Sequence, residues 1–196
     1  HDPWRVVRNI PDWRTIRLWF HELRHDKRSH VLLRAVADEL HKFGVSLLDS
    51  TLPIPDQMAH VGVMTHTQPT PEQRADIDFV WPMLGEVLRL DIGQSIAIRE
   101  RDVIAVEAVE GTDRMIERVA RVCRARGWTL VKGARAGHDR RSDVPTIGAT
   151  TIEKLAAAGG GCLALAAGDV IMLEKERVID LADELGVAIV GVPPEV

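Results

Sequence analysis

The sequence contains little cysteine and no long apolar run. Cys123 and Cys162 are the two cysteines in a chain of 196 residues. A widely separated pair is not the pattern of a disulfide framework, so we expect a reducing compartment. No stretch approaches the roughly 20 apolar residues that cross a bilayer, and no signal-peptide pattern is found. These absences favour a cytoplasmic protein.

The charge balance excludes a further class of function. The formal net charge is −4 and the pI is about 6.1. A broadly basic surface is therefore absent, and we expect no nucleic-acid partner. The 45% hydrophobic content is enough for a folded core. Because the chain opens with His1 rather than methionine, we interpret it as a fragment, a processed form or the ordered part of a longer protein.

Tryptophans and arginines are concentrated in the first 25 residues. Asp12 is a candidate cap for a helix whose apolar face carries Trp13, Trp19 and Phe20. Two interpretations stay open for this helix. It either lies on a membrane surface or packs against its own domain.

A helix, a glycine and a strand are predicted to follow in that order. Residues 29–43 carry apolar side chains at helical spacing, Gly44 ends the helix, and residues 45–48 have the composition of a strand. This order is typical of an α/β layer fold. Four prolines within residues 49–71 predict a linker near residues 65–72.

Helices and strands alternate more clearly in the second half of the chain. Apolar periodicity distinguishes the two kinds of element, and a hairpin is predicted to turn at residues 99–102. We expect helices over residues 72–90, 113–126, 151–158 and 175–185, and strands over 95–98, 103–106, 128–132, 163–166, 170–173 and 187–190.

A first polar junction lies where a predicted strand ends and a helix begins. Residues 107–113 read Glu-Ala-Val-Glu-Gly-Thr-Asp. Thr112 or Asp113 is a candidate cap for the helix. Ligands of open α/β sheets gather where strands end and helices begin, so this junction is a candidate ligand site.

A second polar junction is the loop over residues 138–148. It places Asp139 and Asp143 on either side of two arginines, and Thr150 with Glu153 fits a capping box that starts the next helix. A helix N-terminus beside Asp and Arg side chains can hold both an anionic oxygen and a hard cation. Phosphate-ester chemistry needs that combination.

The two junctions would form an acidic cluster if they are neighbours in space. Carboxylates, water and phosphate are the usual environment of Mg²⁺, and arginine adds bidentate contacts to phosphate oxygens. The alternative is that these residues are only helix caps, solvated acids and an exposed basic pair. The acids concerned are Glu107, Glu110, Asp113, Asp139 and Asp143, and the cations are Lys132, Arg140 and Arg141.

At these residues the sequence resembles the LpxI-type UDP-2,3-diacylglucosamine pyrophosphatases of bacterial lipid A synthesis. The segments that carry the resemblance occur in the order and spacing of that family. They are residues 91–95, 105–113, 130–132 and, most specifically, 139–148, which read Asp-Arg-Arg-Ser-Asp-Val-Pro-Thr-Ile-Gly.

The resemblance implies two α/β domains joined by a linker. We predict a partial, Rossmann-like N-terminal α/β domain over residues 1–70, its back part only, and a C-terminal α/β domain with a mixed sheet over residues 71–196. The chain lacks the glycine-rich N-terminal stretch of the family. It also departs from the family pattern at Ala136, His138 and Ala166.

The resemblance further implies an activity and a site. The activity is the Mg²⁺-dependent hydrolysis of UDP-2,3-diacylglucosamine to UMP and 2,3-diacylglucosamine 1-phosphate, known as lipid X. The implied catalytic residues are Asp143, Asp139 and Arg141. The implied phosphate-binding or substrate-binding residues are Lys132, Arg140, Thr112, Gly111 and Thr146. The implied metal ligands are Asp143, Asp139, Glu110 and Asp113.

The expected partner is a lipid-linked UDP-sugar. A lipid-linked substrate implies that the protein acts at the inner face of the inner membrane and makes peripheral contact with it. We also consider a homodimer. The alternative from another class is a non-catalytic nucleotide-sugar or lipid-binding module of the same fold. The missing N-terminal stretch and Ala166 favour that alternative.

Overall fold

The computed structural model describes residues 29–141 and 144–193. These residues form two compact units. Residues 29–53 and 139–141 make the first, which we call the small unit, and the other described residues make the second, which we call the sheet unit.

The small unit contains helix α2, Ser29–Lys42, which confirms the helix predicted there. Gly44 follows the helix with φ +79°, a left-handed conformation that ends many helices. The strand predicted over residues 45–48 is wrong, because these residues join no sheet of the described chain. A strand-like composition forms a strand only where a neighbouring strand pairs with it. The helix expected at Asp12 lies outside the described residues, and the Rossmann-like character stays a prediction.

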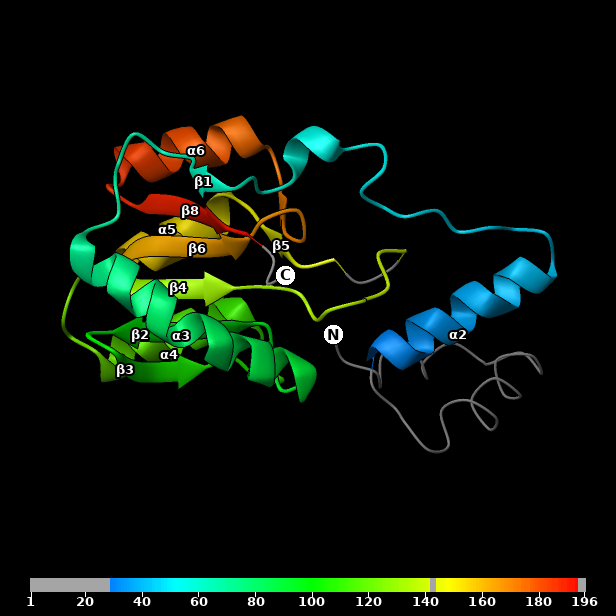
Figure 1. Ribbon diagram of the computed structural model, residues 1–196, viewed down its shortest axis with the longest axis horizontal. Helices are drawn as coiled ribbons and strands as arrows, with labels where there is room; N and C mark the ends of the chain where they lie inside the picture. Colours follow the sequence, from blue (N-terminus) through cyan, green and yellow to red (C-terminus); the bar gives the residue numbers. More distant parts are fainter. Residues whose placement is uncertain (1–28, 142–143, 194–196) are drawn as a thin grey trace. The chain divides into compact units, whose positions relative to one another are not determined.

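The sheet unit is built on a mixed sheet, which confirms the predicted α/β class. Its strands are β1 Gly62–Val63, β2 Ser95–Arg99, β3 Asp102–Val106, β4 Trp128–Lys132, β5 Thr146–Ile147, β6 Gly160–Ala166, β7 Ile171–Met172 and β8 Ala188–Val192. Six of these form one sheet in the order β1-β8-β6-β4-β2-β3 (Figure 1). Strands β4, β6 and β8 are parallel, whereas β1, β2 and β3 run antiparallel to their neighbours. Strands β5 and β7 form a short parallel pair.

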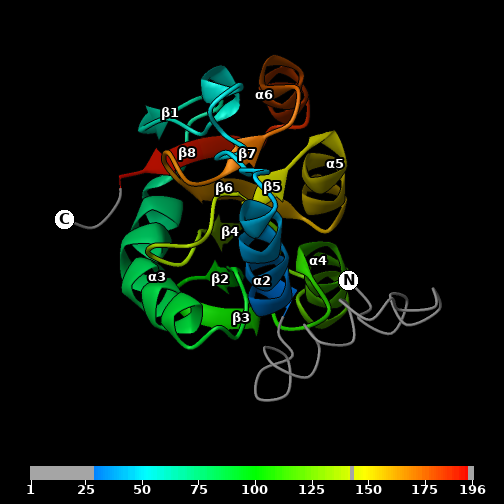
Figure 2. The ribbon, with the colours of Figure 1, turned by 90° about the vertical axis from the view of Figure 1, so that its right-hand side faces the viewer.

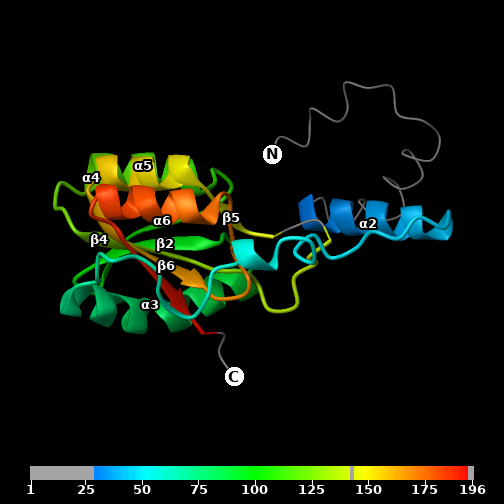
Figure 3. The same ribbon diagram turned by 90° about the horizontal axis from the view of Figure 1, so that it is seen from above.

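Helices cover both faces of this sheet. In the described sheet unit they are α3 Pro71–Arg89, α4 Thr112–Val122, α5 Ala149–Ala157 and α6 Lys175–Glu184, and they confirm the four helices predicted there. Helix α3 lies on one face, and α4, α5 and α6 lie on the other (Figure 2 and Figure 3). Within residues 29–141 and 144–193, none of the helices could span a lipid bilayer.

The sheet unit has a hydrophobic core on each side of the sheet. Successive side chains of a strand point to opposite faces. Val131 and Ala164 therefore pack with α3, whereas Leu130 and Leu163 pack with α4, α5 and α6. All four side chains are buried. This double burial explains why the central strands are continuous apolar runs in the sequence.

Residues 54–70 belong to the sheet unit. Strand β1 pairs with β8, and the short 3₁₀ helix η2, Pro55–Gln57, precedes it. The Lys175 Nζ donates a hydrogen bond to the Met58 carbonyl at 2.7 Å, and the Asp183 carboxylate accepts one from the Thr67 amide at 2.7 Å. Hydrogen bonds with α6 thus hold the proline-containing residues 54–70 in the sheet unit.

The helix starts differ in how their backbone amides are satisfied. At α3, the Thr70 hydroxyl accepts a hydrogen bond from the Gln73 amide and the Gln73 side chain accepts one from the Thr70 amide, which is a complete capping box. Helices α4 and α5 begin after glycines, Gly111 and Gly148, and neither start has a side-chain cap.

The caps that we predicted for α4 and α5 are therefore wrong. Thr112, Asp113 and Thr150 lie inside the first helical turn, one or two residues after the capping glycine. The Thr112 hydroxyl donates to Glu107 Oε2 at 2.9 Å instead of accepting from a helix amide. Threonine and aspartate favour both the cap and the first turn, so composition does not distinguish the two places.

Candidate functional site

The polar end of the sheet lies where β4 ends at Lys132. The ladder pairs Lys132 with Ser95 at the start of β2, and the Ser95 carbonyl accepts the Glu107 amide at 2.8 Å. The turn from β3 to α4 therefore opens at the edge where the parallel strands β4 and β6 have their carboxyl ends. Ligands of open α/β sheets bind outside this edge.

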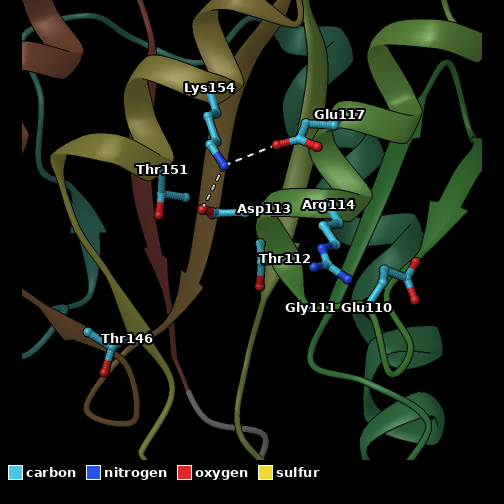
Figure 4. Close-up of a pocket in the computed structure, with 9 residues that line it drawn as sticks. All are labelled: Glu110, Gly111, Thr112, Asp113, Arg114, Glu117, Thr146, Thr151 and Lys154. Carbon is cyan, nitrogen blue, oxygen red and sulfur yellow. Dashed lines mark hydrogen bonds and ion pairs between the residues drawn. The ribbon is translucent and has the colours of Figure 1, made fainter. Parts of the chain in front are cut away.

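A pocket of about 490 Å³ lies beside this edge (Figure 4). The first turns of α4 and α5 border it, and β5 contributes one residue. Figure 4 shows Lys154 of α5 reaching across to Asp113 and Glu117 of α4. The lining residues are Glu110, Gly111, Thr112, Asp113, Arg114, Glu117, Thr146, Thr151 and Lys154.

Two helix N-termini border a pocket whose lining carries three carboxylates and two cations. The first amides of an α-helix have no partner within the helix, and the helix dipole adds roughly half a positive charge at that end. Gly111 and Gly148 supply no side-chain cap to α4 and α5. The backbone at the start of α4 is therefore suited to an anion with several oxygens, such as a phosphate group.

The charged side chains around the pocket are mostly paired. Lys154 Nζ lies 2.9 Å from Asp113 Oδ2 and 3.2 Å from Glu117 Oε1, and these carboxylates raise the pKa of Lys154. Glu110 forms an ion pair with Arg118 at 2.5 Å. The backbone amide of Glu110 and the Arg118 guanidinium lower the pKa of the Glu110 carboxyl. At neutral pH Lys154 is thus a cation and Glu110 an anion.

A buried polar network lies beneath the first turn of α4. Lys132 Nζ donates to Thr112 Oγ1 at 2.7 Å and contacts Ser95 Oγ at 3.5 Å. The Thr112 hydroxyl donates to Glu107 Oε2 at 2.9 Å, and that carboxylate lies 3.9 Å from Lys132 Nζ. Lys132 is 3% exposed and Glu107 is 7% exposed, so both charges are held away from solvent. The network joins β2, β4, α4 and the residue after β3.

The described side chains do not form a preformed metal site. Among residues 29–141 and 144–193, no group of three His, Cys, Asp or Glu side chains lies close enough to hold a metal ion. Glu110 and Asp113, two of the predicted ligands, pair with Arg118 and Lys154. A bound Mg²⁺ needs several oxygen ligands. We therefore derive no chemical step through a metal, and the Mg²⁺ requirement stays a prediction.

The small unit contains residues 139–141 of the second polar junction. Arg141 binds the Asp139 carboxylate through Nη2 at 2.6 Å and Nε at 2.8 Å, and it lies 3.4 Å from Asp38. This guanidinium lowers the pKa of Asp139, and the Asp139 carboxylate raises the pKa of Arg141. The Arg140 carbonyl accepts a hydrogen bond from the Ser50 hydroxyl at 2.7 Å. Asp139 and Arg141 thus neutralise each other.

The structure brings together the predicted site residues of the first junction and one residue of the second, Thr146. Those that line the pocket are Glu110, Gly111, Thr112, Asp113 and Thr146. Lys132 contacts Thr112 from below. Asp139, Arg140 and Arg141 belong to the small unit, and Asp143 lies outside the described residues. The expected meeting of the two junctions therefore stays a prediction.

Sequence reasoning missed four residues of the pocket, Arg114, Glu117, Thr151 and Lys154. Thr151 and Lys154 are three positions apart, which places them on one face of a helix. That spacing indicates a shared face only after the start of α5 is known. Pairing of Lys154 with two acids of α4 is a tertiary contact, and no local pattern indicates it.

Comparison with known proteins agrees with the resemblance noted in the sequence. A family model described as the LpxI C-terminal domain matches residues 60–190, which include every residue that lines the pocket. The UDP-2,3-diacylglucosamine pyrophosphatase LpxI of Caulobacter vibrioides is 37% identical over 176 residues. The aligned part is 86% of this chain and 63% of that protein, so the chain spans less than two thirds of its relative. The chain belongs to the LpxI C-terminal domain family.

Proposed function

We propose that this protein hydrolyses the pyrophosphate bond of UDP-2,3-diacylglucosamine to UMP and lipid X. The family and the name of the Caulobacter relative support the substrate. The observation that carries the proposal is the pocket between two helix N-termini that no side chain caps. Because the chain spans 63% of that relative, the proposal concerns the activity of the whole protein.

In the proposed reaction the pocket holds the phosphate oxygens. The first amides of α4 donate to them, and each hydrogen bond to a charged acceptor contributes about 1.5–3 kcal/mol. Arg114 and Lys154 line the pocket and Lys132 lies below it, and these cations offset the lining carboxylates Glu110, Asp113 and Glu117. Donors fixed in advance stabilise charge as it develops on the transferred phosphoryl group.

The acids of the second junction complete the proposal. We assign water activation or metal binding to Asp143 and Asp139, and phosphate neutralisation to Arg140 and Arg141. Asp139 is held by Arg141 in the small unit, so Asp143 is the first residue to test. The Mg²⁺ expected from the sequence would screen the phosphate charge.

The test is UMP release from UDP-2,3-diacylglucosamine by the full chain, with Mg²⁺ and with a chelator. We expect Asp143→Ala to abolish release mainly through kcat, because it removes a transition-state interaction. Asp78→Ala is the matched control, since Asp78 is an exposed acid of α3. Undiminished turnover by Asp143→Ala contradicts the assignment. Equal rates with and without chelator contradict the metal requirement.

A non-catalytic nucleotide-sugar or lipid-binding module is the second candidate. The observation that favours it is that no three His, Cys, Asp or Glu side chains within residues 29–141 and 144–193 lie close enough to hold a metal ion. Under this alternative a UDP-sugar raises the melting temperature by mass action, yet no UMP forms when Mg²⁺ is present. UMP release at any rate that depends on Asp143 rejects the alternative.

The proposed substrate also suggests where the protein works. A lipid-linked nucleotide is presented at a membrane surface, so we propose a cytoplasmic protein that makes peripheral contact with the inner membrane. Cosedimentation with vesicles that carry the substrate tests this contact. Protein that stays in the supernatant at every vesicle concentration contradicts it.

A further inference from the structure

A buried acid that the proposed reaction does not use lies directly beneath the pocket. Glu107 follows β3 and is 7% exposed, and its carboxylate accepts the Thr112 hydroxyl at 2.9 Å. Thr112 is the first residue of α4 and lines the pocket. Glu107 itself does not line the pocket. Any effect of Glu107 on a bound phosphate therefore passes through another residue.

The hydrogen bonds of this network have a defined direction. The Lys132 ammonium has only donors, and the ionised Glu107 carboxylate has only acceptors. Thr112 Oγ1 accepts from Lys132 at 2.7 Å, so its single proton is directed to Glu107 at 2.9 Å. Glu107 thus determines the orientation of the Thr112 hydroxyl, and through it the place of the Lys132 ammonium.

The surrounding backbone leaves Glu107 little freedom. The Glu107 amide donates to the Ser95 carbonyl at 2.8 Å. A Cβ on Gly93 would lie 2.0 Å from the Glu107 carbonyl oxygen, so the chain before β2 packs tightly against this residue. The carboxylate is therefore attached to a rigid part of the sheet edge, whereas the first turn of α4 has no side-chain cap.

We propose that Glu107 is a positioning residue that holds Thr112 and Lys132 in place at the start of α4 for the pyrophosphate group. This inference rests on the proposed function and adds a residue to it. The alternative role is structural, in which Glu107 only neutralises the buried charge of Lys132. A buried charge that loses its partner is destabilising, so both roles predict a loss of stability for Glu107→Ala.

Four variants of the full chain separate the two roles. They are Glu107→Gln, Glu107→Ala, the double variant Glu107→Ala with Lys132→Met, and the control Glu176→Gln at an exposed acid of α6. The measurements are melting temperature, the rise in melting temperature caused by inorganic pyrophosphate, and kcat and KM for UMP release.

We expect Glu107→Ala to reduce kcat by about a hundredfold, the size of effect seen when a fixed transition-state donor is lost. Glu107→Gln keeps an acceptor for Thr112 but loses the charge, and we expect a reduction of about tenfold with KM within twofold. The double variant removes both buried charges, so it regains melting temperature but not turnover. The control keeps the wild-type values.

Two results overturn the proposal. The first is wild-type turnover by Glu107→Gln, which is informative even if Glu107→Ala does not fold. The second is a double variant that regains turnover together with stability, because charge neutralisation then explains the whole effect. If the wild-type chain releases no UMP, the proposed function fails. The rise in melting temperature caused by inorganic pyrophosphate then tests whether Glu107 is a positioning residue. An equal rise for wild type and Glu107→Gln contradicts positioning, and a smaller rise for the variant supports it.

Discussion

The start of α3 differs from the starts of α4 and α5 in how the first backbone amides of the helix are satisfied. At α3 the side chains of Thr70 and Gln73 satisfy the first amides, and Gln73 Nε2 also donates to the Gly127 carbonyl at 3.0 Å. At α4 and α5 the capping residues are glycines without side chains. The first arrangement is closed and structural. The second leaves amides beside a pocket, where a ligand can take the place of the cap.

Buried acids at the two ends of the sheet show the same contrast. Asp76 of α3 is 2% exposed and accepts the amides of Glu100 and Arg101 at 3.0 and 2.7 Å. These two residues form the β2–β3 turn with φ +52° and +64°, so Asp76 holds a strained hairpin turn. Glu107 accepts from Thr112 beside the pocket instead. A buried acid thus serves the fold at one end and, as we propose, the ligand at the other.

Gly111→Ala should change turnover most among the variants that test this contrast between the helix starts. Gly111 has φ +83° and ψ 164°, a region open almost only to glycine, so alanine there costs roughly 1–3 kcal/mol. Because the start of α4 must shift, we expect turnover to fall by about a hundredfold. Kinetics of UMP release and a melting curve measure both effects.

Gly85→Ala is the matched control for that variant. Gly85 lies in the interior of α3 with open space around its Cβ position, so alanine should stabilise the protein by about 0.5–1 kcal/mol and leave turnover unchanged. Equal turnover for the two variants would contradict a role of the α4 start in the reaction.

Asp76→Ala has the next largest expected effect, and it concerns stability alone. Two backbone amides of the turn lose their acceptor, and since one hydrogen bond contributes about 0.5–1.5 kcal/mol, we expect a loss of about 1–3 kcal/mol in the free energy of unfolding. Urea denaturation measures it, and Asp78→Ala, an exposed acid on the same helix, is the control. A loss of turnover at temperatures where the variant is folded would show that this end of the sheet also serves the reaction.

Thr70→Ala has the smallest expected effect. It removes one cap of α3, which costs about 1 kcal/mol of stability and leaves kcat and KM unchanged. Thermal unfolding and UMP release test both parts. A change in KM larger than the change expected from unfolding would contradict the view that the capped start of α3 is only structural.

Strong periodicity predicted the elements of the sheet unit well. Strand β4 has the bounds expected from its apolar run, and the hairpin of β2 and β3 turns where residues 99–102 predicted it. The strand expected over residues 45–48 failed, because pairing and not composition makes a strand. The predicted cap of α4 was wrong for a related reason. We expected the Thr112 hydroxyl to accept from a backbone amide, but it donates to the Glu107 carboxylate.

The sequence alone specified the apolar runs, the turn residues and the family motifs, because these depend on residues that are neighbours in the chain. It therefore indicated the α/β class and most residues of the first polar junction. Only the tertiary structure decided that Lys154 crosses to α4, that Lys132 is buried beneath Thr112, and that two helices begin uncapped at one pocket. Hydrogen bonds between distant segments depend on how the strands are ordered in the sheet, and no local spacing contains that information.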